Sequence, residues 1–286
     1  MASTASLKIL CARFARRSRA PGLPGRPCFS LLSPRSPQNI LELILELRDK
    51  ITSVHDDGHE VGERFDSEDF AARLREVVAR PLDGWREVYE SFSPVDLKTG
   101  EQRPRVPPPG ADPRQAGVLV PVLLEPEGAR LVYTLRKNHL RDHAGQISFP
   151  GGAPEPGDES LLGTALREAE EEINLRPALV EVVGELEEMY IPPSRFLVRP
   201  FVGLLPQKAE LTLDPEEVEA IFCVSLGELM APESFKKVIW ERDGHPHEVP
   251  VFAVEGHEIW GATAAMTAGL LARLGWKMGG TTSTQD

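Results

Sequence analysis

The segment from residue 151 to residue 175 constrains the fold more than any other part of the chain. Within it, residues 159–173 carry small and aliphatic side chains at intervals of three and four, the period of a helix with one buried face. This apolar stripe consists of Leu162, Ala165, Leu166, Ala169 and Ile173. The segment therefore predicts an amphipathic helix, with Asp158 as the residue that caps its N-terminus.

The same helix carries three carboxylates on a second face. Glu168, Glu171 and Glu172 are spaced at i, i+3 and i+4, which places them next to one another. Like charges at this spacing repel, so the face is either an ordinary solvated surface or a site for a hard divalent cation. Gly151 and Gly152 precede the helix, and such a pair lets the backbone approach a metal or a phosphate closely. This diglycine loop favours a divalent-cation site over an ordinary solvated surface.

Other segments of the chain predict a mixture of strands and helices. A second helix is expected at residues 262–274. Continuous or alternating apolar runs predict strands at residues 117–124, 130–135, 180–186, 196–205, 249–254 and 258–260. Residues 245–247 are expected in a turn between strands. Strands mixed with separated helices favour an α+β or α/β sandwich.

The chain is expected to divide into five parts. Residues 39–92 predict a helical N-terminal extension, because apolar side chains recur there at helical spacing. Residues 93–115 predict a linker or surface loop, because their prolines exclude a helix or a central strand. The main domain is expected at residues 116–276, followed by a disordered tail at 277–286.

Residues 1–38 have the composition of a mitochondrial presequence. They contain no Asp or Glu, and they are rich in Arg and Ser. This predicts a disordered targeting segment and a location in the mitochondrial matrix. The alternative is a disordered basic N-terminal arm.

Charge and hydropathy exclude several classes of function. The whole chain has a net charge of −12 although residues 1–41 are basic, so the rest is strongly acidic and general nucleic-acid binding is not expected. No apolar run reaches the length of a membrane-spanning helix. The three cysteines form no CxxC pair, which argues against a disulfide scaffold and a thiolate zinc site. The chain is therefore expected to be a soluble protein, and an acidic body that handles a phosphorylated small molecule needs divalent cations or a local basic patch. The sequence gives no indication of the oligomeric state.

Residues 167–175, Arg-Glu-Ala-Glu-Glu-Glu-Ile-Asn-Leu, together with the diglycine loop resemble the Nudix box, G-x5-E-x7-R-E-U-x-E-E-x-G-U. Asn174 replaces the usual glycine, a mild change because asparagine also tolerates the left-handed conformation. The loop is one residue longer than the general pattern, so either Asp158 or Glu159 fills the remaining acidic position. The resemblance implies an α/β/α sandwich with a mixed sheet between helices.

The upstream sequence resembles a narrower group, the coenzyme A pyrophosphatase-type Nudix hydrolases. Their signature LLTxRSxxLRxHxGxxxFPGG is similar to residues 131–152, with Lys137 in place of a small residue. This group includes mitochondrial and peroxisomal coenzyme A diphosphatases, and it has the longer loop. The resemblance implies hydrolysis of coenzyme A and acyl-coenzyme A to 3′,5′-ADP and (acyl-)4′-phosphopantetheine.

The Nudix resemblance also implies roles for the acidic face. Glu168, Glu171 and Glu172 would hold Mg²⁺ or Mn²⁺, and one of them would activate a water molecule. Arg167 would orient a neighbouring carboxylate, that of Asp158 or Glu159. A further acid from outside the box is common in the superfamily, and Glu217 is the candidate. The alternative for Glu216, Glu217 and Glu219 is a solvated acidic helix.

A basic cluster precedes the diglycine loop. Arg136 and Arg141 occupy signature positions, and His143 follows them. We expect these three residues, with Gly151 and Gly152, to bind the substrate, since arginine pairs well with phosphate. Lys137 and His139 are expected to be ordinary loop residues.

The sequence leaves two other functions open. The first is hydrolysis of another nucleoside diphosphate derivative, such as NADH, a dinucleoside polyphosphate or a capped RNA. The second is a Nudix module that binds a nucleotide without cleaving it. The intact run of acids at 168–172 argues against the second.

Overall fold

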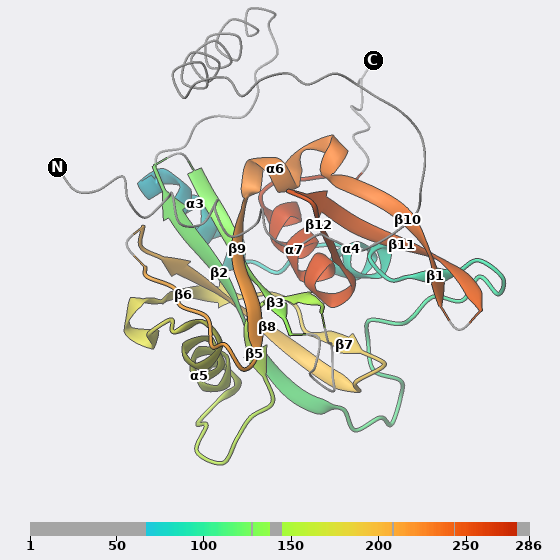
Figure 1. Cartoon of the computed structure of the whole chain (residues 1–286), viewed down its shortest axis with the longest axis horizontal. Coiled ribbons are helices and arrows are strands. Elements are labelled where there is room, and N and C mark those ends of the chain that lie inside the picture. The colour runs from blue at the N-terminus through green and yellow to red at the C-terminus, as the bar shows by residue number, and fades with distance from the viewer. Residues whose placement is uncertain (1–66, 127, 138–144, 208, 243, 279–286) are drawn as a thin grey trace, which may run out of the picture. The chain divides into compact units, whose positions relative to one another are not determined.

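The computed structural model describes residues 67–126, 128–137, 145–207, 209–242 and 244–278 (Figure 1). These residues belong to one unit of the chain, Gly62–Asp286. The predicted presequence, the larger part of the predicted N-terminal extension and residues 279–286 of the predicted tail lie outside the described residues. So do two predicted substrate-binding residues, Arg141 and His143.

An eight-stranded mixed sheet forms the centre of this unit. Its main path runs β4-β3-β2-β8-β6, with β5 paired to β2, β7 to β8 and β9 to β3. Strands β2 and β8 run parallel, and the other pairs are antiparallel. The strands are β2 (Arg114–Glu125), β3 (Gly128–Arg136), β4 (Ile147–Ser148), β5 (Gly151–Gly152), β6 (Glu181–Glu185), β7 (Met189–Ile191), β8 (Phe196–Leu205) and β9 (Val218–Ser225).

Strand β2 is buried on both faces, which explains its continuous apolar sequence. Leu119 and Leu123 belong to the core on one face of the sheet. Val120 and Val122 belong to the core on the other face. A strand covered on both sides carries apolar residues at every position instead of at alternate ones.

Helix α5 (Leu161–Ile173) packs on the first face of the sheet. The predicted apolar stripe provides the contact. Ala165, Ala169 and Ile173 are fully buried, and Leu162 and Leu166 pack at the edge of the same core. The helix predicted from periodicity is therefore confirmed, with its first turn starting two residues later than expected.

Helices α7 (Gly261–Arg273), α4 (Trp85–Ser91) and α3 (Ser67–Val78) belong to the core on the second face. Tyr133 of β3 and Thr267 of α7 share a buried hydrogen bond of 3.0 Å between their hydroxyl groups. Figure 1 shows α5 and α7 on opposite sides of the central strands. The predicted α+β class, an α/β/α sandwich with a mixed sheet between helices, is confirmed.

A smaller sheet of four strands lies beside α7. Its path is β1-β11-β10, and β12 pairs with β11. These strands are β1 (Val95–Asp96), β10 (Phe235–Arg242), β11 (His245–Val254) and β12 (His257–Trp260). Three short helical segments complete the described chain: Pro177–Leu179, α6 (Leu226–Met230) and Pro232–Ser234. Among the described helices, none has both the length and the apolar character needed to cross a membrane.

The structure differs from the sequence-based expectations in three places. The acidic stretch 216–222 leads into strand β9 instead of forming a helix, because it pairs with β3. Residues 245–247 lie in strand β11 instead of a turn, and His245 Nδ1 is 2.7 Å from Asp96 Oδ2. The Pro-rich segment 93–115 contains β1, which pairs with β11. Pairing partners distant in sequence decide all three cases.

Candidate active site

Helix α5 begins at a serine cap and ends at a left-handed asparagine. The side-chain oxygen of Ser160 accepts a hydrogen bond of 3.0 Å from the backbone N–H of Gly163. The prediction of Asp158 as the cap was wrong, because Arg167 engages that carboxylate. Asn174 has φ 54° and ψ 32°, the conformation expected where the Nudix pattern has glycine.

The three predicted acids of α5 differ sharply in burial. The side chain of Glu172 is 2% exposed, that of Glu168 is 17% exposed and that of Glu171 is 58% exposed. One turn of helix separates Glu168 from Glu172, so these two point toward the interior beside β3 and β5. Glu171 lies at the solvent edge of the same face.

Arg167 connects the loop before α5 to α5 itself through hydrogen bonds. Its guanidinium donates to Asp158 at 3.1 and 3.2 Å, to Glu168 at 3.0 Å and to Glu171 at 2.7 Å. It also reaches the carbonyl oxygen of Ala153 at 3.3 Å. The arginine hydrogen bonds lower the pKa of Asp158 to about 2, with help from the backbone N–H of Glu155.

The contacts of Arg167 show which acid fills the uncertain position of the box. Asp158 accepts from Arg167 and also from the Thr164 hydroxyl, at 2.9 Å. Glu159 is exposed. The longer loop therefore presents Asp158, and not Glu159, to the arginine.

The diglycine segment lies directly against Glu168. A Cβ atom placed on Gly152 would be 2.5 Å from Oε1 of Glu168 and 2.7 Å from its carboxyl carbon. Only glycine fits at this position without displacing the carboxylate. Burial raises the pKa of Glu168, while Arg167 opposes the rise and the charges of Glu171 and Glu217 add to it.

Arg136, at the end of β3, holds Glu172. Its Nη1 donates to Oε1 of Glu172 at 2.8 Å. The other oxygen, Oε2 of Glu172, is buried and has no hydrogen-bond partner. Burial raises the pKa of Glu172 to about 7; Arg136 opposes this shift, and Glu168 and Glu217 contribute to it.

Glu217 reaches the same place from the segment just before β9. Its Oε2 is 3.8 Å from Nη2 of Arg136, and its backbone oxygen accepts from the backbone N–H of Lys137 at 3.0 Å. Arg136 thus has Glu172 on one side and Glu217 on the other. Glu217, the candidate for a further acid, therefore lies at the site. The helix considered for residues 216–222 does not form.

The carboxylates do not form a ready-made metal site. Within the described residues, no three Asp, Glu, His or Cys side chains are gathered as ligands of one ion. Arg167 draws Glu171 outward, and Arg136 occupies one oxygen of Glu172. The predicted trio of Glu168, Glu171 and Glu172 is therefore not gathered around one point.

The residues present nevertheless fit a divalent cation. The unpartnered Oε2 of Glu172 is a buried carboxylate oxygen next to Glu168, and hard cations take carboxylate oxygens as ligands. Leaving such an oxygen buried without a partner costs free energy that a cation offsets. Glu217, which lies outside the Nudix box, is a third carboxylate whose charge acts on Glu172.

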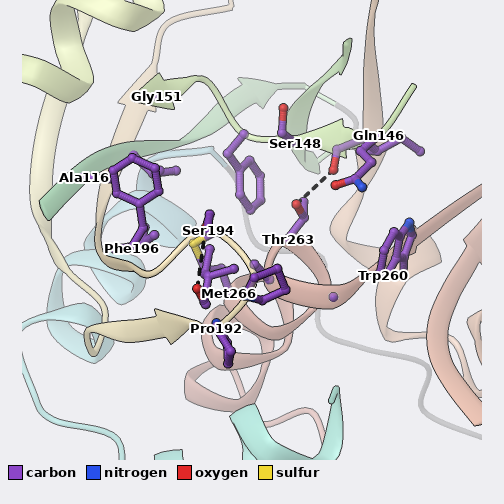
Figure 2. Close-up of a pocket in the computed structure, with 18 of the residues that line it drawn as sticks. Ala116, Gln146, Ser148, Gly151, Pro192, Ser194, Phe196, Trp260, Thr263 and Met266 are labelled. Atoms are coloured by element: carbon purple, nitrogen blue, oxygen red, sulfur yellow. Dashed lines mark hydrogen bonds between the residues drawn. The ribbon is translucent and has the colours of Figure 1, made fainter. Parts of the chain in front are cut away.

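A cavity of about 480 Å³ adjoins the diglycine segment (Figure 2). Gly151, Gly152 and Ala153 line one part of it. Figure 2 shows Phe196, Met266 and Trp260 around the same space, and Thr263 donates from its hydroxyl to the carbonyl oxygen of Ile147 at 2.9 Å. Four arginines contribute to the lining: Arg103, Arg105, Arg136 and Arg242.

The structure thus brings together most of the predicted site residues. Arg136 lines the cavity, but its direct contact is with the acids. Lys137, expected to be an ordinary loop residue, donates to the carbonyl oxygen of Pro215. Sequence reasoning missed Arg103, Arg105 and Arg242, because the prolines around the first two indicated a linker and nothing marked the third.

The chain is similar in sequence to proteins of one known family. Residues 113–243 match the family model described as the NUDIX domain. The Uncharacterized Nudix hydrolase NudL of Photorhabdus laumondii is 40% identical over 166 residues, covering 57% of this chain and 88% of the relative. NudL of Yersinia pestis is 40% identical over 153 residues, covering 54% and 76%. Among solved structures, a MutT/nudix family protein from Enterococcus faecalis has a TM-score of 0.41 at 12% identity, covering 75% of each chain.

The identity to NudL extends over most of the length of the bacterial relatives, so the relation concerns the whole catalytic domain and not one motif. The chain belongs to the Nudix hydrolase family.

Proposed function

We propose that this Nudix hydrolase cleaves the diphosphate of coenzyme A and of acyl-coenzyme A, giving 3′,5′-ADP and (acyl-)4′-phosphopantetheine. The observation that carries the proposal is the position of the acids beside the diglycine segment. Glu168 touches Gly152 on one side, and an arginine-lined cavity adjoins the same glycines. The similarity of residues 131–152 to the coenzyme A signature supports the choice of substrate.

The chemistry requires charge neutralisation on the diphosphate and an activated water. Mg²⁺ or Mn²⁺ supplies both when it is bound to carboxylates of the site. Glu172 and Glu168 are the residues of this chain that would hold the cation, with Glu171 at the solvent edge. Arg136 orients Glu172 through one oxygen and leaves the other available. Glu217, which is about half exposed and next to Arg136, is the residue that we expect to accept a proton from the attacking water.

Incubation of the purified protein with coenzyme A and Mg²⁺ or Mn²⁺ is expected to yield 3′,5′-ADP and 4′-phosphopantetheine, identified by mass spectrometry. Chelation with EDTA should stop the reaction. A panel with NADH, a dinucleoside polyphosphate and capped RNA, at matched concentrations, is the control. Faster turnover of any of these would move the assignment to that substrate, and binding without products would indicate a non-catalytic module.

We further propose that the enzyme acts in the mitochondrial matrix. Residues 1–41 contain seven Lys or Arg and no acid, a composition that favours import toward a negatively charged matrix face. A fluorescent reporter fused behind residues 1–40 is expected to co-localise with a matrix marker. A reporter spread through the cytosol would contradict this location.

A further inference from the structure

Arg105 is an arginine buried in the wall of the cavity. Only 4% of it is exposed. Its Nη2 donates to the carbonyl oxygen of Phe92 at 2.9 Å, and its backbone oxygen accepts from the N–H of Tyr190 at 2.8 Å. Its Nε atom is buried and has no hydrogen-bond partner. Among the described residues, no ion pair joins Arg105 to a carboxylate.

Such a guanidinium is costly for the fold. A buried charge normally has an opposite charge or a full set of hydrogen bonds, and without them the cost of removing the charge from water is not offset. Burial lowers the pKa of Arg105 to about 10, and the neighbouring charge of Arg103 lowers it further. An anionic ligand would compensate the buried guanidinium of Arg105, whose Nε has no hydrogen-bond partner.

Arg105 lines the same cavity as the diglycine segment. The cavity that it lines also borders Gly151, Gly152 and Ala153, so a ligand with its diphosphate at the diglycine segment extends into the same space. Apolar groups such as Phe196 and Ile191 form much of the remaining wall. Low polarity strengthens a pairing between guanidinium and anion. Arginine also suits phosphate and carboxylate groups, because it donates two parallel hydrogen bonds.

We infer that Arg105, with Arg103 beside it, binds an anionic group of the substrate other than the diphosphate that is cleaved. The inference rests on the proposed function, since it concerns the same cavity. Two parts of a coenzyme A derivative carry such a group. One is the 3′-phosphate of the nucleoside half, and the other is the terminal carboxylate of a dicarboxylic acyl chain.

Kinetics of Arg105→Gln on two matched substrate pairs test the inference. Coenzyme A and 3′-dephospho-coenzyme A differ by the phosphate, and succinyl- and butyryl-coenzyme A differ by the carboxylate. In one pair, the preference in kcat/KM for the compound with the extra anion is expected to fall at least about tenfold, the effect of losing one charge-assisted hydrogen bond. The pair affected identifies the group that Arg105 binds. An equal loss on all four compounds, or no loss, overturns the inference.

Two controls separate binding from folding. Arg199→Gln removes an arginine on β8 that pairs with Glu188 and does not line the cavity, and it should leave both preferences unchanged. If Arg105→Gln does not fold, Arg105→Lys keeps the charge without the paired donors, and it must show the same selective loss, at least about threefold. An unselective loss in that variant overturns the inference.

Calorimetric binding of the same four compounds without a divalent ion separates this inference from the proposed function. If none of the four compounds is hydrolysed, the proposed substrate is wrong. The inference about Arg105 is still supported if the wild type binds the compound with the extra anion more tightly and Arg105→Gln does not. Absence of that preference in the wild type overturns the inference.

Discussion

Replacing Glu172 by glutamine is expected to lower kcat by at least about three orders of magnitude while making the metal-free protein more stable above pH 7. The first effect follows because a cation site that loses its most buried carboxylate loses several kcal/mol of transition-state stabilisation. Glutamine has almost the same shape as glutamate, and its amide oxygen still accepts from Arg136. The loss of activity would therefore arise from lost charge and not from lost packing.

The second effect follows from the pKa of Glu172. Burial raises it from the ordinary 4.5 to about 7, so the folded state holds this proton more tightly than the unfolded state does. Ionisation of Glu172 in the folded state therefore lowers the free energy of unfolding. This loss is absent below about pH 4.5, grows between pH 4.5 and 7, and is complete above pH 7. Glutamine removes this cost. We expect the free energy of unfolding of the variant to exceed that of the wild type by about 1–3 kcal/mol at pH 8.

Urea unfolding in EDTA at pH 5 and pH 8 measures the stability effect, with the larger difference at pH 8. Glu171→Gln is the matched control on the same helix, because its carboxylate is 58% exposed and bound to Arg167. It should reduce activity less than Glu172→Gln and change stability by no more than about 0.5 kcal/mol. Full activity of Glu172→Gln with millimolar Mg²⁺, or a less stable variant at pH 8, would contradict the role given to this residue.

Replacing Gly117 by alanine is expected to cost at least about 3 kcal/mol of stability and most of the activity. A Cβ atom on Gly117 would lie 2.0 Å from the carbonyl oxygen of Leu161 and 3.2 Å from the backbone nitrogen of Ala165. Both atoms belong to the backbone of α5, so no side chain can turn away. The helix must move off β2, and the acids move with it. Gly117 also pairs with Gly152, so the movement separates the acids from the diglycine segment.

Gly163→Ala is the matched control within the same helix. Its Cβ would meet only the Ser160 hydroxyl, at 3.6 Å, and alanine favours helix more than glycine does. This variant should be more stable than the wild type by about 0.5–1 kcal/mol and fully active. Thermal and urea unfolding, with turnover at saturating substrate, compare the two. A Gly117→Ala protein as stable as the wild type would show that α5 does not pack on β2 as described.

Features that depend on residues near one another in the chain could be predicted from the sequence. A periodic or compositional signal within a few residues marks three such features. They are the apolar stripe of α5, the left-handed Asn174, and strand β2, which is buried on both faces. The same holds for the acids of the box, whose spacing puts them on one helical face. In each case the neighbours that decide the conformation are close in the chain, so the pattern carries the information.

Other features depend on partners far away in the sequence. Strand β9 forms because β3 is available to pair with it, although its acidic start resembles a solvated helix. Arg105 enters the cavity because the Pro-rich segment packs against the domain, which its composition does not reveal. The unequal burial of Glu168, Glu171 and Glu172 has the same origin.

The amino-acid pattern alone determined the helix, its acidic face and the resemblance to the Nudix hydrolases. Only the tertiary structure decided which carboxylate is buried, that Asp158 and not Glu159 pairs with Arg167, and that Glu217 joins the site beside Arg136. The physical reason is that spacing along a helix sets which side chains share a face. Burial and pairing depend on what other segments of the chain place against that face.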